Sequence, residues 1–411
     1  MLCKAVLFVA LLGAIGALPT DGPVDYSHHK IVKILPKRYG DLQRLHRLKD
    51  VFDTKVDFWN PPVADMRPVL TLVGPDSGYQ FLRSLNASRI PYEVVANSFQ
   101  KVIDNERAEM RAHRLYSRAG FDYEKTYHTY DEIVAELTSI SSPKAKYASI
   151  GKTYQGRDIP SITITNTGGS GKKAIFLECG IHAREWVTTA ACLWIANELI
   201  TKSDYDTILN KYEIIIVPTL NSDGYVYTHT SNRNWRKTRS QNGLCYGADP
   251  NRNWDASWCS AGASSSPCSD TYCGTAAFSE IEAKNMANLV TTKRGNVAAY
   301  FSVHSYSQLW MYPWGYKTAS PPNAKQLDDL SALGVNAIKA VNGLTFTKGT
   351  IANTICSSID WAYDKEGVTI AFALELRDKG DYGFVLPASQ ILPASKETWA
   401  GIKAVIDGLP A

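Results

Sequence analysis

Short, mainly apolar runs recur through the C-terminal part of the chain, and each ends at a glycine or a polar residue. Three of them span residues 172–179, 297–303 and 368–374. Runs of this length with such boundaries predict buried strands. After the first run, residues 187–200 place apolar positions at helical spacing without a proline, which predicts a helix. The pattern indicates one α/β domain with a mixed, mostly parallel central sheet flanked by helices.

Residues 18–118 carry a different pattern and predict a separate small domain. The expected strands and helices span residues 29–35, 42–52, 56–59, 68–73, 78–85 and 92–96. Their order, β-α-β-β-α-β, is ferredoxin-like. A polar, arginine-rich stretch at residues 98–118 predicts a helix that connects this domain to the larger one at residues 119–411.

The N-terminus predicts export. Lys4 precedes an apolar run from Ala5 to Leu18 that is too short to span a bilayer and ends in small residues near Ala17, so we expect residues 1–17 to be a signal peptide. Elsewhere the sequence predicts no transmembrane helix, and no basic run with interleaved aromatic residues indicates nucleic-acid binding. With 45% hydrophobic residues and a net charge of +4, the composition is globular. We expect a secreted monomer that binds neither membranes nor nucleic acid.

Cysteine usage fits an oxidising compartment. The chain has eight cysteines, and seven remain once Cys3 leaves with the signal peptide. An odd number leaves at least one cysteine unpaired, and spacing alone cannot assign the pairs. A second zinc site at residues 259–273 is an alternative interpretation, but that cluster lacks a CxxC motif and a nearby histidine.

Metal-ligating side chains stand where two of the predicted strands end. His182 and Glu185 follow the first run, and their i, i+3 spacing puts both side chains on one face of the turn that leads into the next helix. His304 directly follows the second run. Catalytic zinc usually takes three protein ligands, and two histidines with one glutamate are a recurring set. His229 lies in a polar segment and is interpreted as a loop histidine.

Glu375 ends the third apolar run, where a carboxylate is costly unless it is paired or functional. These residues belong to six motifs: GIHAREW at 180–186, NWRKTRS at 234–240, DPNRNWD at 249–255, SVHSYSQ at 302–308, SIDW at 358–361 and ELRDKGDYGFVLPASQI at 375–391. With these motifs the chain resembles the zinc metallocarboxypeptidases of the pancreatic, digestive type, from about residue 120 to the C-terminus. A matching propeptide precedes that part.

The resemblance implies a role for each matching residue. His182, Glu185 and His304 would bind one Zn²⁺ ion, Glu375 would act as the catalytic base and acid, and Arg236 would polarise the scissile carbonyl. Asp249 would orient the imidazole of His182. The implied substrate contacts, of which Asn251 and Arg252 would hold the terminal carboxylate, are Arg184, Asn251, Arg252, Ser305, Tyr306 and Phe384.

In this family, the base of the pocket for the C-terminal residue sets the side-chain preference. Counting from the SIDW motif, the position that is acidic in enzymes that remove Lys or Arg is Ile359 here. With Gly315, Ile351 and Ala373, it implies an apolar pocket and a preference for aliphatic or aromatic residues. The alternative is that Ile359 is an ordinary core residue.

The resemblance also implies three disulfides and one departure from the family. The implied pairs are Cys179–Cys192, Cys245–Cys268 and Cys259–Cys273, which leaves Cys356 free. Cys356 aligns with a mobile tyrosine that closes over the substrate in the family, and the loop after it is shorter by about four residues. No tyrosine lies between Tyr316 and Tyr363.

Two alternatives to an active carboxypeptidase remain open. The first is a catalytically weakened family member that binds peptides, because the closing tyrosine is missing. The second is a different metal hydrolase, such as an amidase. Glu375 argues against the first, and the Asn251-Arg252 pair argues against the second. The favoured interpretation is a secreted zymogen, which acts on peptides or proteins with a free C-terminus once a trypsin-like protease has cut it. Candidate cleavage sites in the connecting helix are Arg107, Arg111, Arg114 and Arg118.

Overall fold

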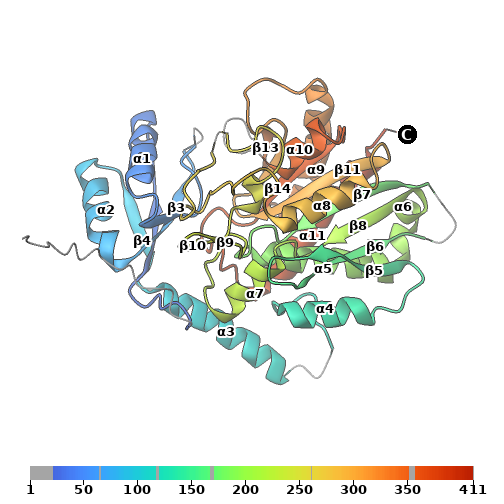
Figure 1. Ribbon diagram of the computed structural model, residues 1–411, viewed down its shortest axis with the longest axis horizontal. Coiled ribbons are helices and arrows are strands. Elements are labelled where there is room, and N and C mark those ends of the chain that lie inside the picture. Colours follow the sequence, from blue (N-terminus) through green and yellow to red (C-terminus); the bar gives the residue numbers. More distant parts are fainter. Residues whose placement is uncertain are drawn as a thin grey trace, which may run out of the picture.

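The computed structural model describes residues 22–63, 66–116, 120–166, 171–260, 262–350 and 357–410. The predicted signal peptide, Arg118, Ile351 and Cys356 lie outside these ranges. Figure 1 shows a small N-terminal part in blue and a larger part in which helices flank a central sheet. One long helix connects the two parts.

The small part has the predicted β-α-β-β-α-β order. Its elements are β1 (Lys30–Ile34), α1 (Tyr39–Val51), β2 (Val56–Phe58), β3 (Val69–Val73), α2 (Pro75–Ala87) and β4 (Tyr92–Ala96). The strands form an antiparallel sheet in the order β2-β3-β1-β4. Helix α2 begins earlier than predicted because Pro75 suits the first turn of a helix. Val32, Leu45 and Phe81 belong to the core between the sheet and the helices.

Helix α3 (Phe99–Tyr116) connects the two parts and packs against the larger one. Met110 is buried in the apolar core of the larger part. Glu106 forms a buried ion pair with Arg233, in which Arg233 Nε lies 2.6 Å from Glu106 Oε2. The connecting helix predicted from the sequence is confirmed over its described residues, and its middle is anchored on the larger part.

The larger part is built on one eight-stranded sheet in the order β13-β12-β14-β11-β7-β8-β6-β5. Its strands are β5 (Ala145–Lys152), β6 (Asp158–Ile164), β7 (Lys173–Cys179), β8 (Tyr212–Val217), β11 (Val297–Ser305), β12 (Leu309–Tyr312), β13 (Thr347–Thr350) and β14 (Ala371–Leu376). The pairs β12–β13, β14–β11, β11–β7 and β7–β8 are parallel, and the others are antiparallel. The three apolar runs are β7, β11 and β14, which lie side by side. The predicted mixed, mostly parallel sheet is confirmed.

Helices cover both faces of this sheet (Figure 1). They are α4 (Tyr130–Ser139), α5 (Trp186–Thr201), α6 (Asp206–Lys211), α7 (Ser222–Thr230), α8 (Ile281–Thr291), α9 (Ala324–Asn342), α10 (Ser358–Asp364) and α11 (Ile391–Asp407). Successive side chains of β7 point to opposite faces. Ile175 and Leu177 join the core with α5 and α11, whereas Ala174 and Phe176 join the core with α8 and α10. Burial on both faces explains why this strand is apolar along most of its length.

Short elements and disulfides complete the larger part. The short elements are η1 (Ser203–Tyr205), β9 (Gln241–Asn242), β10 (Cys245–Tyr246), η2 (Pro250–Arg252) and η3 (Ala388–Gln390). The disulfides are Cys179–Cys192, Cys245–Cys268 and Cys259–Cys273, which are the pairs that the family resemblance implies. Within the described ranges, no helix is both long enough and apolar enough to cross a membrane.

The interpretation of His229 as a loop histidine is wrong. His229 lies near the end of α7 and stacks on Trp186, with ring centroids 4.0 Å apart. The guanidinium carbon of Arg233 lies 3.7 Å from a ring centroid of the same tryptophan. The polar sequence around His229 suggested a loop, but its half-buried ring stacks on Trp186 and so packs the end of α7 against α5.

Candidate active site

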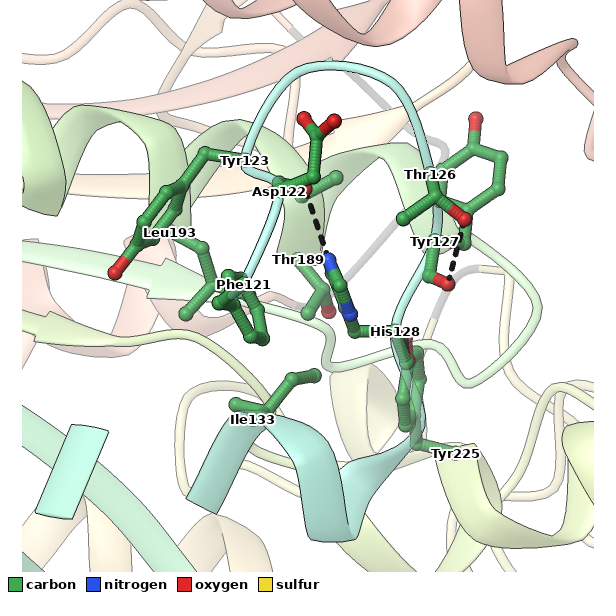
Figure 2. A pocket seen from close by; sticks show the side chains of 11 residues that line it. Phe121, Asp122, Tyr123, Thr126, Tyr127, His128, Ile133, Thr189, Leu193 and Tyr225 are labelled. Carbon is green, nitrogen blue, oxygen red and sulfur yellow. Dashed lines mark hydrogen bonds between the residues drawn. The ribbon is translucent and has the colours of Figure 1, made fainter. Parts of the chain in front are cut away.

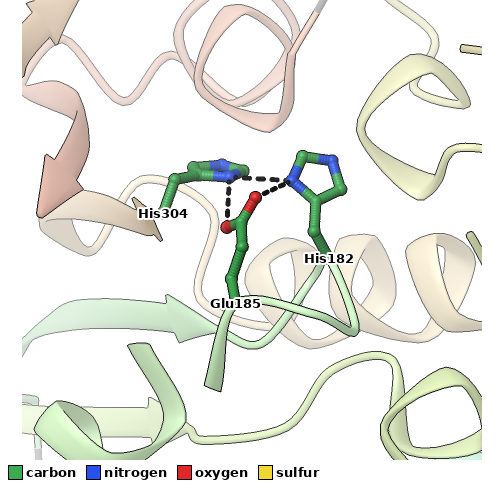
Figure 3. A group of neighbouring side chains, drawn as sticks. All are labelled: His182, Glu185 and His304. Carbon is green, nitrogen blue, oxygen red and sulfur yellow. Dashed lines mark hydrogen bonds and ion pairs between the residues drawn. The ribbon is translucent and has the colours of Figure 1, made fainter. Parts of the chain in front are cut away.

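His182, Glu185 and His304 meet at the carboxyl edge of the sheet. Strand β7 ends just before Gly180, which turns the chain with a φ of +62° and where a Cβ would lie 2.8 Å from Thr189 Oγ1. A side chain at this position would be strained and would clash, so glycine is required for the turn that places His182 and Glu185. His304 lies near the end of β11, the parallel neighbour of β7. Figure 3 shows the three side chains pointing toward one another.

The ligand atoms of these three residues are spaced for one metal ion. His182 Nδ1 lies 2.9 Å from Glu185 Oε1 and 3.2 Å from His304 Nδ1, and His304 Nδ1 lies 3.4 Å from Glu185 Oε2. Ligands of a tetrahedral zinc, each about 2.0–2.1 Å from the metal, stand roughly 3.3 Å apart. All three residues are buried. Two imidazole nitrogens and one carboxylate at these distances fit zinc.

Asp249 holds the outer nitrogen of His182. Asp249 Oδ1 lies 3.1 Å from His182 Nε2, and Asp249 Oδ2 accepts a hydrogen bond from Arg236 Nη2 at 2.9 Å. Burial alone would raise the pKa of Asp249, but Arg236, Arg252 and His182 outweigh burial and hold this pKa well below its usual range. An ionised Asp249 therefore accepts from the ring of His182 and ties Arg236 to the same site.

Glu375 lies beside the metal-ligand cluster on β14, in register with His304 on β11. Its Oε2 is enclosed and makes no hydrogen bond within the described part of the chain. Burial, and after it the charge of Glu185, raises the pKa of Glu375 to about 8. A carboxyl group with such a pKa, next to a metal site, is suited to proton transfer.

Asn251 and Arg252 lie in η2, which Asp249 caps by accepting a hydrogen bond from Asn251 N at 2.9 Å. Arg252 Nη1 donates to the carbonyl oxygen of Asn251 at 3.0 Å and lies 3.7 Å from Asp249 Oδ2. Asn251 Oδ1 accepts from Ser358 N at 3.0 Å. These bonds fix the guanidinium of Arg252 and the amide of Asn251 close to the metal-ligand cluster, where both groups are suited to binding the carboxylate of a substrate.

The other implied substrate contacts have different surroundings. Ser305 contacts the metal-ligand cluster, because its backbone N donates to Glu185 Oε2 at 3.1 Å. The remaining three contact the small part of the chain. Arg184 Nη1 lies 2.7 Å from Asp57 Oδ2, and Tyr306 Oη lies 3.1 Å from Asn60 Oδ1. The Phe384 ring centroid lies 5.2 Å from that of Trp59. The small part therefore covers this side of the site.

Two residues of the implied specificity pocket lie on one face of the sheet. Ile359, at the start of α10, and Ala373, on β14, are buried in the same apolar cluster. Gly315 N donates to Asp360 Oδ1 at 2.9 Å. Burial raises the pKa of Asp360 to about 7, and its oxygens are already bonded to backbone N–H groups. The fourth pocket residue, Ile351, lies outside the described ranges.

Sequence reasoning missed two buried polar residues next to His304. Ser302 Oγ lies 2.9 Å from His304 Nε2 and 3.0 Å from Glu178 Oε1. Glu178 is fully buried on β7. A carboxylate inside an otherwise apolar strand is costly unless it is bonded, so its place within the first apolar run was a usable signal.

A small cavity lies beneath the segment that follows α3, and none of the three metal-ligand candidates lines it. Its volume is about 10 Å³, and Figure 2 shows its lining. His128 stacks on Phe121 there with ring centroids 3.6 Å apart, and His128 Nε2 lies 2.8 Å from the carbonyl oxygen of Asp122. A cavity of this volume holds about one water molecule, so it offers no room for a peptide.

The site is that of a zinc-dependent hydrolase. It combines two histidines and a glutamate, which fit one zinc ion, with the carboxyl group of Glu375 and the guanidinium of Arg236 at the carboxyl edge of an α/β sheet. Residues 130–401 match the sequence profile of the family described as zinc carboxypeptidase, and residues 32–106 match that of the carboxypeptidase activation peptide. The chain belongs to the zinc carboxypeptidase family and is a metallocarboxypeptidase with an activation peptide.

Known relatives match this chain over nearly its full length. Carboxypeptidase A1 of Homo sapiens is 39% identical, and the match covers 97% of this chain and 96% of the relative. Carboxypeptidase A4 of Mus musculus is 38% identical, with 98% and 97% covered. Among solved structures, carboxypeptidase A from Helicoverpa armigera matches with a TM-score of 0.85 at 27% identity, covering 92% of this chain and 97% of that one. Thrombin activatable fibrinolysis inhibitor matches with a TM-score of 0.83 at 30% identity, covering 93% and 99%.

Proposed function

We propose that the processed protein removes single residues, preferentially aliphatic or aromatic ones, from the free C-termini of peptides and proteins. The observation that carries this proposal is the placement of Glu375. Glu375 is in register with His304, and its Oε2 makes no hydrogen bond with any residue that the structure describes, so a proton acceptor stands beside the metal site. This arrangement favours hydrolysis over a role limited to peptide binding.

The proposed mechanism assigns one task to each charged group. His182, Glu185 and His304 would hold the zinc ion, which would supply a water molecule of lowered pKa and polarisation of the peptide carbonyl. Glu375 accepts the proton of the attacking water and returns it to the leaving amine. The guanidinium of Arg236 is preorganised by Asp249 and meets the negative charge that develops on the carbonyl oxygen.

Recognition of a free C-terminus is proposed to rest on Arg252 and Asn251. A guanidinium matches a carboxylate geometrically, and the bonds within η2 hold this one in place before a substrate arrives. Arg252 and Asn251 also favour an exopeptidase over an amidase, because an amidase does not need to bind a free C-terminal carboxylate. We further propose that Cys356 stands in the place of the family's closing tyrosine, and we therefore expect weaker substrate binding, seen mainly as a raised KM.

Blocked dipeptides provide the direct test of this function. The trypsin-treated protein is expected to hydrolyse substrates that end in Phe or Leu, and removal of the metal by a chelator is expected to abolish turnover, with recovery on addition of Zn²⁺. The measurement is the release of the free C-terminal residue. Binding of the same dipeptides without turnover would favour the peptide-binding alternative.

The change Ile359→Asp tests the specificity pocket. Ile359 places no charge in the pocket, so a lysine ammonium would be buried there without a partner. An aspartate would supply that partner, and we expect kcat/KM for substrates ending in Lys, relative to Phe, to rise by about 10- to 100-fold. Ile359→Val is the matched control, because it changes volume without adding charge. A wild-type protein that already prefers Lys would contradict the pocket assignment.

The remaining proposals concern processing and location. We propose that residues 1–17 are removed on export, that residues 18–118 form the propeptide, and that residues 119–411 form the secreted, monomeric enzyme, which acts in a digestive lumen. The three disulfides support an oxidising compartment. Helix α3 is continuous to Tyr116, and Arg114 lies in its last turn. Helix ends open more readily than helix middles, so cleavage by a trypsin-like protease is expected at this end.

A further inference from the structure

Glu178, Ser302 and Ala373 form one row across three neighbouring strands. Ser302 on β11 is in register with Glu178 on β7 and with Ala373 on β14. His304 lies two residues further along β11, so its side chain leaves the same face of the sheet as that of Ser302. The row therefore lies directly next to the metal-ligand cluster, on the side of the protein interior.

Glu178 is the acceptor at the inner end of a hydrogen-bond chain. It has no solvent exposure, and its two oxygens accept hydrogen bonds from the hydroxyls of Tyr300 and Ser302, the latter at 3.0 Å. A buried carboxylate is retained at such a position only when its oxygens are bonded. A hydroxyl has one proton to donate, so Ser302 directs its proton to Glu178 and is left with lone pairs for its other neighbour.

That other neighbour is His304. Ser302 Oγ lies 2.9 Å from His304 Nε2, and Asn251 Nδ2 lies 3.4 Å from the same nitrogen. The amide of Asn251 is oriented by Ser358 N, which donates to its Oδ1, so its NH₂ group faces the ring and cannot accept. Ser302 is the nearer neighbour and has already given its proton to Glu178, so it can only accept from Nε2. The Asn251 amide, at 3.4 Å, is too distant to be a strong competing donor to Nε2, so the lone pair of the neutral ring is left on Nδ1.

Nδ1 is the atom of His304 that faces His182 and Glu185, at 3.2 Å and 3.4 Å. We infer that Glu178 is a positioning residue for the zinc site: through Ser302 it fixes the tautomer and the orientation of His304, as Asp249 does directly for His182. The inference rests on the proposed zinc site at these three residues. Partners of this kind typically contribute about 10- to 100-fold in metal affinity or activity.

Variants of Ser302 separate the hydrogen bond from packing. Ser302→Thr keeps the hydroxyl, whereas Ser302→Val has the shape of threonine without it. The measurement is the rate of zinc release from the full chain into excess chelator. We expect Ser302→Val to release zinc at least ~10-fold faster than Ser302→Thr. Ser331→Ala is the control. It removes a serine hydroxyl in α9 that is equally buried and donates to the carbonyl oxygen of Leu327.

A second variant and a second measurement complete the test. Glu178→Gln keeps an acceptor oxygen for Ser302 but removes the charge, so a smaller acceleration of zinc release is expected; this variant also serves if the Ser302 variants do not fold. In ¹⁵N-histidine NMR spectra of the metal-free chain, His304 is expected to be protonated on Nε2 in the wild type and to lose this preference in Ser302→Val.

The outcomes separate the inference from the proposed site. Absence of zinc from the wild-type protein would refute the metal site itself. Zinc binding by the wild type, with equal release rates in Ser302→Val, Ser302→Thr and Glu178→Gln and an unchanged tautomer, would overturn the role of Glu178 alone. Faster release confined to Ser302→Val and Glu178→Gln, with Ser331→Ala unchanged, would support it.

Discussion

Replacing Glu375 with glutamine is expected to leave zinc bound and to lower kcat by about 10²- to 10⁴-fold. Glutamine has nearly the same size as glutamate but cannot accept the proton of the attacking water. The three metal ligands do not include Glu375, so zinc content should not change. The measurements are kcat on a blocked dipeptide and the zinc content of the purified, processed variant.

A matched control is Glu213→Gln. Glu213 lies near the amino end of β8 and pairs with Lys293 at 2.5 Å, away from the carboxyl edge of the sheet where Glu375 and the metal-ligand cluster lie. This variant should keep near-normal kcat. Near-normal turnover by Glu375→Gln would refute the assignment of the catalytic base, whereas loss of zinc from that variant would show that Glu375 supports the metal site instead.

The intact chain is expected to be nearly inactive, and cleavage at the C-terminal end of α3 is expected to release full activity. Two ion pairs hold the small part and α3 against the site: Asp57 with Arg184, and Glu106 with Arg233. Trp59 packs against Phe384, and Asn60 accepts from Tyr306. A peptide cannot reach these side chains while the small part occupies them. The measurement compares the same small substrate before and after trypsin treatment.

Glu106→Ala tests which contact maintains this latency. Removing one partner of a buried ion pair costs about 3–5 kcal/mol, because Arg233 would remain buried without its carboxylate. The uncut variant is therefore expected to gain at least tenfold in basal activity, since about 1.4 kcal/mol already corresponds to that factor. Glu109→Ala, at an exposed position of the same helix, should have no effect. Equal rates of hydrolysis by the intact and the cleaved wild-type protein would show that the small part does not inhibit the enzyme.

The pattern of apolar residues was enough to predict the central strands of the large sheet and the candidate metal ligands at their ends. The apolar runs predicted β7, β11 and β14, because strands buried on both faces need continuous apolar residues. Their ends carried His182, Glu185, His304 and Glu375, and parallel strands bring their carboxyl ends to one edge. The β-α-β-β-α-β order of the small part was also predicted, because each of its strands and helices carries its own apolar periodicity, although α2 begins at Pro75, earlier than predicted.

Other contacts between distant residues became known only from the folded structure. The contact of Asp57 with Arg184 joins positions whose separation carries no periodic signal, so no pattern in the sequence could predict it. The position of His229 was misjudged because stacking on Trp186 outweighed the polar character of its neighbours. Glu178 was visible in the sequence as a carboxylate in an apolar strand, but its link to His304 through Ser302 depends on strand register. Register is set by packing across the whole sheet, and the sequence of one strand does not contain it.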